Sequence, residues 1–162
     1  MGTRATILDR WLARAVAIYG ERVALHAATV NDPTRNLIGH RLRTNMSAAV
    51  DELLGGMGQT AIAKAFEEIT ALRAVQNVTI VQALSFVFDL RTIVREELPT
   101  FDERELEKRI DILSLAAFAE FLRCRERLFE LRLSERLREL GPQYQNSCER
   151  RAESGALRGA VG

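Results

Sequence analysis

The chain has 162 residues, of which 47% are hydrophobic and 28% are charged, so it suits one domain with a sizeable core. The 23 basic and 22 acidic residues leave a net charge of +1, which excludes a global attraction to nucleic acid or to an anionic membrane. No apolar run approaches the roughly 18 residues of a membrane span, and the N-terminus lacks the apolar core of a signal peptide, so we expect a cytoplasmic protein.

The first two predicted helices are marked by apolar residues at helical spacing. The first runs from about Arg4 to Tyr19, with a continuation toward Leu25 left open; its face is Leu8, Trp11, Leu12, Ala15, Ile18 and Tyr19. The second follows Asn31-Asp32-Pro33, with Asp32 as N-cap and Pro33 at the first helical position. Its face is Ile38, Leu42, Met46, Ala49 and Leu53, and Gly55-Gly56 ends it through the left-handed conformation that glycine adopts.

The third predicted helix, from about Gln59 to Val75, carries a charge on its apolar face. The face consists of Ile62, Phe66 and Ile69, and the same spacing continues to Arg73 and Gln76. A guanidinium on such a face costs free energy unless it is paired. Arg73 therefore either forms an internal ion pair or hydrogen bond, to Asp89 or to a carbonyl at a helix end, or it anchors an anionic ligand.

The fourth predicted helix begins at Thr79, where Thr79-x-x-Gln82 fits a capping box, and Pro99 closes it after Leu98. Its polar residues Gln82, Ser85, Asp89, Thr92 and Glu96 recur at spacings of 3, 4, 3 and 4. This spacing gathers them on one narrow stripe and leaves the rest of the circumference to pack. We therefore predict that this helix is central to the fold.

The fifth predicted helix opens at Thr100-x-x-Glu103 and extends to about Leu140, where Gly141-Pro142 stops it. One nearly heptad seam comprises Leu106, Ile110, Leu113, Ala117, Phe121, Cys124, Leu128 and Leu131. A second face comprises Phe118, Leu122, Phe129, Leu133, Leu137 and Leu140. We expect residues 1–140 to form the domain and 141–162 a flexible tail.

The length of the fifth helix predicts a homodimer. From Asp102 to Leu140 it would measure about 58 Å, against about 30 to 40 Å for a compact domain of this size. Its last turns must overhang, yet they carry Phe129, Leu133, Leu137 and Leu140, which a monomer would expose. Symmetric pairing of two copies along this stripe would cover them. The alternative is a break near Arg123 that folds the helix back on its own domain.

Several segments together resemble the RsbRD N-terminal domain family, the non-haem globin-like sensory domains of stressosome co-antagonist proteins. They are Trp11, Asn31-Asp32-Pro33, Leu72 to Gln76 and the helix from Thr79 to Leu98, and the resemblance covers about residues 5 to 140. It implies an all-α, globin-like bundle of five to six helices with a long C-terminal helix, usually dimeric. In stressosome proteins that helix leads into a STAS domain, but only 22 residues follow Leu140 here, so the chain resembles a stand-alone sensory module.

The resemblance also implies which residues could bind a ligand. Related non-haem sensors are thought to hold an apolar chain with an anion, so Arg73, Gln76 and Gln82 are candidate anion donors. Phe66, Phe86 and Phe88 are candidate cavity residues, although aromatics at this spacing also serve as plain core. Haem is not expected, because the region that would supply a proximal ligand, near residues 59 to 77, contains no histidine. His26 and His40 are expected at the surface or at a helix end.

No pattern of catalytic residues favours an enzyme. The sequence contains no catalytic-triad order, no glycine-rich phosphate loop and no zinc spacing, and Cys124 and Cys148 suit a reduced protein without a metal or disulfide. The leading hypothesis is a sensory or regulatory domain that binds a small anionic or apolar ligand, or a signalling protein partner. The rival is a structural adaptor dimer without a small ligand.

Overall fold

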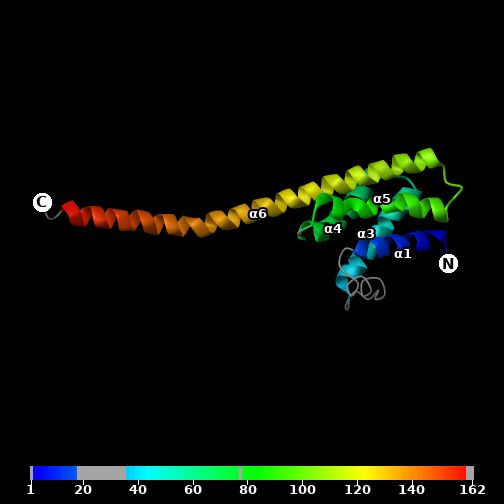
Figure 1. Cartoon of the computed structure of the whole chain (residues 1–162). Coiled ribbons are helices and arrows are strands. Elements are labelled where there is room, and N and C mark those ends of the chain that lie inside the picture. Colours follow the sequence, from blue (N-terminus) through cyan, green and yellow to red (C-terminus); the bar gives the residue numbers. More distant parts are fainter. Residues whose placement is uncertain (1, 18–35, 77, 160–162) are drawn as a thin grey trace. The chain divides into compact units, whose positions relative to one another are not determined.

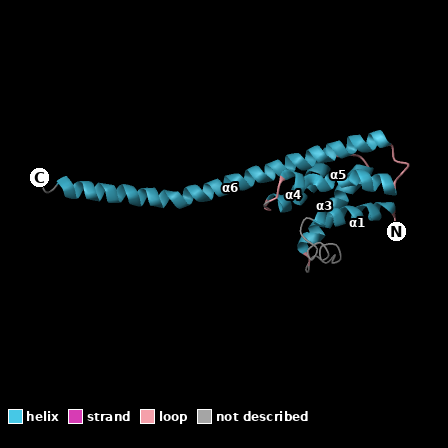
Figure 2. Ribbon diagram, in the orientation of Figure 1, coloured by secondary structure: helices cyan, strands magenta, loops and turns pink. Residues whose placement is uncertain are grey.

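The protein is all-α, as the computed structural model of the chain shows for residues 2–17, 36–76 and 78–159, with side chains described as far as residue 140. Five helices lie within this part, and none of its residues forms a strand (Figure 2). The helices are α1 (Thr3–Val16), α3 (Leu37–Leu54), α4 (Gln59–Ala74), α5 (Ile80–Glu97) and α6 (Glu103–Gly159). The predicted all-α class with a long C-terminal helix is confirmed.

The chain divides into two compact units, Met1–Arg125 and Glu126–Gly162. In the first unit, α3 packs on α4 and on α1, and α5 packs on α1 and α4. Figure 1 shows α5 between α1 and the part of α6 that belongs to the same unit. The second unit consists of the rest of α6 and the last residues of the chain.

Helix α1 buries the face that the sequence predicts, because Leu8, Trp11, Leu12 and Ala15 are at most 5% exposed. Ile7 and Val16 are buried beside them, which widens the predicted face. The Trp11 ring stacks on Phe86 of α5 with 5.6 Å between ring centroids, and its indole Nε1 donates to the Phe86 carbonyl oxygen at 2.7 Å. Ile18, Tyr19 and the open continuation toward Leu25 lie outside the described residues.

The start of α3 differs from the prediction. The helix begins at Leu37, and its N-cap is Asn36, whose side chain accepts a hydrogen bond from the Gly39 N–H at 2.9 Å. Asn31-Asp32-Pro33 lie outside the described residues. Of the predicted face, Leu42, Met46, Ala49 and Leu53 are buried, but Ile38 is 56% exposed.

The end of α3 is where the sequence predicts it, but glycine does not provide the left-handed residue. Gly55 has a φ of −116°, and Met57 takes the positive φ of 53°. An arginine caps this end: the Arg109 guanidinium donates to the carbonyl oxygens of Leu53 at 2.7 Å and Gly55 at 2.9 Å. These bonds satisfy carbonyls that the end of a helix leaves without intrahelical donors.

Helix α5 starts with the predicted capping box. The Thr79 hydroxyl oxygen accepts from the Gln82 N–H at 3.2 Å, and the Gln82 side chain accepts from the Thr79 N–H at 3.0 Å. The predicted central position is confirmed by its buried residues Ala83, Leu84, Phe86, Val87, Leu90, Ile93 and Val94. The expectation that all its apolar residues pack is wrong, since Val81 is 76% and Phe88 51% exposed.

Helix α6 begins two residues later than a cap at Thr100 predicts. Its N-cap side chain is that of Asp102, whose carboxylate accepts from the Glu105 N–H at 2.8 Å. The predicted seam is buried from Leu106 to Cys124, whereas Leu128 is half-buried and Leu131 is 55% exposed. The predicted stop at Gly141-Pro142 is wrong, because α6 continues to Gly159.

A proline inside a helix removes one backbone hydrogen bond. Helix α6 continues on both sides of Pro142 and tolerates this loss. The Gly141-Pro142 pair therefore does not stop the helix in this chain. The division into a domain of residues 1–140 and a flexible tail of residues 141–162 stays a prediction.

Candidate functional site

Arg73 is the predicted site residue that carries a buried charge. It lies on α4, one residue before the helix ends, and is only 1% exposed. Its guanidinium Nη2 donates to the Ala15 carbonyl oxygen at 2.5 Å, and its Nη1 donates to the Ala83 carbonyl oxygen at 2.9 Å. The guanidinium carbon also lies 4.1 Å from the centroid of the Phe86 ring, a cation–π distance.

These contacts place Arg73 where three helices meet. Ala15 lies in the last turn of α1, and Ala83 lies in the first turn of α5. The cation therefore meets the Ala15 carbonyl oxygen near the C-terminus of α1, where the helix dipole concentrates negative charge. The sequence left two structural roles open for Arg73, a bond to Asp89 or a bond to a carbonyl at a helix end. The hydrogen bonds shown for Arg73 go to carbonyl oxygens.

Among the described residues of the first unit, three arginines cap the end of a helix distant in the chain. Arg73 serves the end of α1, Arg109 serves the end of α3, and Arg125 donates to the Ala74 carbonyl oxygen at the end of α4 at 3.2 Å. In each pair the two residues are more than 50 positions apart in the chain, so sequence periodicity could not reveal the acceptors. Each bond joins the C-terminus of one helix to another element of the fold.

The structure brings only part of the predicted ligand set together. Phe66 and Phe86 are both buried, and Phe86 lies against Arg73. Phe88 is 51% exposed and lines a different hollow. Gln82 is exposed and is engaged in the capping box, while Gln76 is half-buried. Within the predicted set, a direct contact is shown between Arg73 and Phe86.

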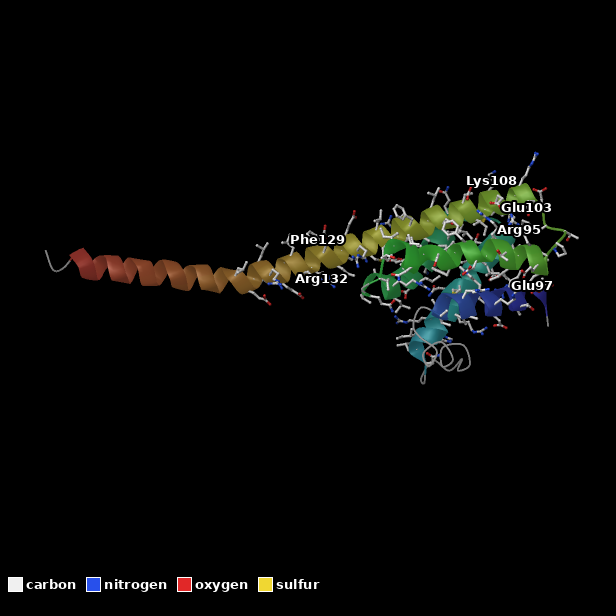
Figure 3. The ribbon with its side chains drawn as sticks, viewed as in Figure 1. Arg95, Glu97, Glu103, Lys108, Phe129 and Arg132 are labelled. Atoms are coloured by element: carbon white, nitrogen blue, oxygen red, sulfur yellow. The ribbon has the colours of Figure 1, made fainter. Side chains whose placement is uncertain are left out.

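The predicted dimer residues are exposed in the second unit. Phe129 is 67% exposed, Leu133 49%, Leu137 62% and Leu140 43%. Figure 3 labels Phe129 and Arg132 on this part of α6. Their neighbours in sequence are mainly arginine and glutamate, so the apolar side chains stand within a charged helix.

A hollow that the sequence did not predict lies between α5 and α6 in the first unit. It has a volume of about 350 Å³ and opens to solvent. Its apolar lining comes from Val81, Leu84 and Phe88 of α5 and from Leu115 and Phe118 of α6. The seven-residue spacing of Val81 and Phe88 on α5 was the available sequence signal for this hollow. An apolar run alone does not show which of its residues remain exposed to solvent.

Ion pairs hold α5 to the first turns of α6 beside this hollow. Arg95 bonds Glu103 (Figure 3) and also Glu107 at 2.7 Å, and Arg91 bonds Glu107 at 2.8 Å. The hydrogen bond from Arg95 lowers the pKa of Glu103 below its ordinary value. On the other side of the unit, the bond from Arg4 of α1 lowers the pKa of Asp51 of α3 in the same way. These pairs are largely solvent-exposed, so each adds little stability.

The described residues offer no evident metal site or membrane segment. Across residues 2–17, 36–76 and 78–140, no group of three or more His, Cys, Asp or Glu side chains could hold a metal ion. No helix in the described part of the chain has the length and apolar character needed to cross a bilayer. His40 is half-buried on α3, Cys124 is buried on α6, and His26 lies outside the described residues. The side chain of Cys148 lies outside the described part as well.

Comparison with protein families gives one match. Residues 5–136 fit the family model described as the RsbT co-antagonist protein rsbRD N-terminal domain. No significant match to this chain was found among curated proteins or among solved structures. The matched range ends within α6, eleven residues into the second unit.

Proposed function

Because this chain belongs to the RsbRD N-terminal domain family, we propose that it is a non-enzymatic sensory domain that binds a ligand or partner and signals through a dimeric C-terminal helix. The family consists of regulatory sensory domains associated with stressosomes, and it is not known for catalysis. Its role in stressosome assemblies points to protein partners. We propose a cytoplasmic location and no direct contact with nucleic acid or membrane.

The observation that carries this proposal is the exposed apolar set on the second unit. Phe129, Leu133, Leu137 and Leu140 are all between 43% and 67% exposed on a continuous helix. Large apolar side chains gathered in this way mark a surface that another protein covers. A symmetric pair of copies is the commonest solution, and in it each stripe would pack on its equivalent.

A signal that begins in the first unit would reach this surface through α6, the only helix that belongs to both units among the described elements. The Arg125 bond to the Ala74 carbonyl joins the last residue of the first unit to the end of α4. Arg73, one residue earlier on α4, joins α4 to α1 and α5. A rearrangement of these helix ends would therefore act directly on α6 where the second unit begins.

The environment of Arg73 favours the second candidate, an adaptor dimer that docks on a larger assembly without a small-molecule ligand. Its two hydrogen bonds to backbone carbonyls and its stacking on Phe86 give the buried charge an internal role. An anionic ligand at Arg73 would have to compete with these acceptors. We propose in either case that the domain holds no haem, because residues 59 to 77 contain no histidine.

Native mass spectrometry of the purified full chain separates the two candidates. A sensory domain with a bound ligand should retain a small molecule that adds a reproducible mass to each chain and disappears after denaturation. An adaptor should give the mass of the bare polypeptide, or of whole multiples of it. Retention of stoichiometric haem, lost on replacing His26 or His40 with Ala, would contradict the proposal of a haem-free domain.

A further inference from the structure

The last turn of α4 contacts three other helices through two neighbouring residues. Arg73 donates to the Ala15 carbonyl oxygen of α1 at 2.5 Å and to the Ala83 carbonyl oxygen of α5 at 2.9 Å. The next residue, Ala74, accepts a hydrogen bond on its carbonyl oxygen from the Arg125 guanidinium of α6 at 3.2 Å. One turn of helix therefore joins the end of α1 and the start of α5 to α6.

A second contact joins the same turn of α4 to α6. The Thr70 hydroxyl oxygen lies 3.9 Å from the Cys124 sulfur, and both residues are buried. Cys124 directly precedes Arg125, and Thr70 lies four residues before Ala74. The two helices therefore meet through a buried contact as well as through the bond to the Ala74 carbonyl, and a displacement of either turn would disturb both.

The end of α4 receives its cap from α6. The backbone closes with the Gln76 N–H, which donates to the Arg73 carbonyl oxygen at 3.1 Å. The last carbonyls of a helix lack intrahelical donors, and an arginine can satisfy them from another element. Arg125 does this for Ala74. Without Arg125 the last turn of α4 would open more often, and Arg73 lies in that turn.

The buried charge of Arg73 makes the contact between these helix ends costly to break. The side chain is 1% exposed, so water does not replace a hydrogen bond that the guanidinium loses. A buried charged group without its partners retains the cost of desolvation. If the end of α1 moved, the last turn of α4 would have to move with it, or Arg73 would lose the Ala15 acceptor.

We propose that the last turn of α4 is a coupling device, which transmits a displacement of the end of α1 to α6 at Arg125, the last residue of the first unit. Arg73 is the positioning residue of this device. The inference rests on the proposed function, because it names how a change in the first unit reaches α6. Coupling between two sites is reciprocal, so a change at Arg125 must also reach the end of α1.

Hydrogen exchange of backbone amides in the full chain measures this reciprocity. The readout is the protection factor of residues 12–16, at the end of α1, divided by that of residues 90–94 in the buried part of α5. A general loss of stability cannot lower this ratio, because it acts at least as strongly on a core helix as on a helix end. We expect Arg125→Met to lower the ratio at least about fivefold, the lower end of typical couplings between sites.

Arg109→Met is the matched control, because Arg109 also lies on α6 but caps the end of α3 through the carbonyls of Leu53 and Gly55. It should leave the ratio at its wild-type value. Arg73→Met interrupts the device, so adding Arg125→Met to it should lower the ratio no further. Circular dichroism checks that the variants fold. Should Arg73→Met not fold, the comparison of Arg125→Met with Arg109→Met decides alone.

A ratio lowered by less than about fivefold in Arg125→Met, or lowered equally in Arg109→Met, would overturn the coupling. A further loss on adding Arg125→Met to Arg73→Met would overturn the part assigned to Arg73. These ratios report on the first unit and not on the number of chains, so they leave the proposed homodimer to be tested by its mass. A dimer without the coupling would overturn this inference and leave the proposed function intact.

Discussion

Arg73 shows how a single buried charge can organise the ends of several helices. It is fully buried, yet its guanidinium meets the last turn of α1 and the first turn of α5 and stacks on Phe86. Carbonyls at the end of a helix lack intrahelical donors, so a cation placed there satisfies them and interacts favourably with the dipole. The internal role of Arg73 follows from these contacts.

Replacing Arg73 with Met should destabilise the protein by about 2 to 5 kcal/mol, because the carbonyls of Ala15 and Ala83 lose buried donors. Arg14→Met, at an exposed position of α1, is the matched control and should stay within about 0.5 kcal/mol. Urea unfolding monitored by circular dichroism measures both. If the charge serves the carbonyls, adding Asp89→Asn should change the loss by no more than about 0.5 kcal/mol. Recovery of most of the stability in the double variant would identify an ion pair with Asp89 instead.

Phe86 and Phe88 form a natural pair of test positions, since they lie two residues apart on α5 but in opposite environments. Phe86 is 2% exposed and contacts Trp11 and Arg73, whereas Phe88 is 51% exposed. Phe86→Ala should cost about 3 to 5 kcal/mol through the cavity it leaves, and Phe88→Ala no more than about 1 kcal/mol. Chemical denaturation of the two variants at equal protein concentration compares them. Equal losses would show that the outer side of α5 is packed and not exposed.

At the scale of elements, the sequence predicts the third and fourth helices closely, because their signals are local. Gln59–Ala74 and Ile80–Glu97 match the predicted ranges to within a residue or two, and the Thr79 capping box is present. Such caps depend on residues three positions apart, which a sequence displays directly. The predicted start of α3 was wrong because Asn36, and not Asp32, is its N-cap. The predicted end of the last helix was wrong because Pro142 does not break α6.

The sequence did not show which side of a helix remains exposed to solvent. Helix α5 is apolar on most of its circumference, so periodicity predicted packing all round. Only the positions of α1, α4 and α6 show that Val81 and Phe88 lie on the uncovered side. The acceptors of Arg73 could not be predicted for the same reason. The sequence identified Arg73 as a buried charge, but its acceptors, Ala15 and Ala83, come from other helices.

At the scale of the whole molecule, the family match and the exposed residues support one account. Residues 5–136 place the chain among the RsbRD N-terminal domains, a family of regulatory sensory domains. In this account the first unit provides the packed core, and α6 transmits a conformational change in that unit to other proteins. The apolar side chains of the second unit are then the contact surface that a partner copy covers.

The mass of the chain in solution tests the central claim, a homodimer built on α6, most directly. One chain has a mass of 18.2 kDa, so light scattering at micromolar concentration should give about twice that value for the wild type. Leu133→Asp/Leu137→Asp should shift the protein to the mass of a single chain without loss of helix content, because each copy would bury two charges in the contact. A wild-type mass of one chain, or a dimer that this double variant leaves intact, would contradict the account.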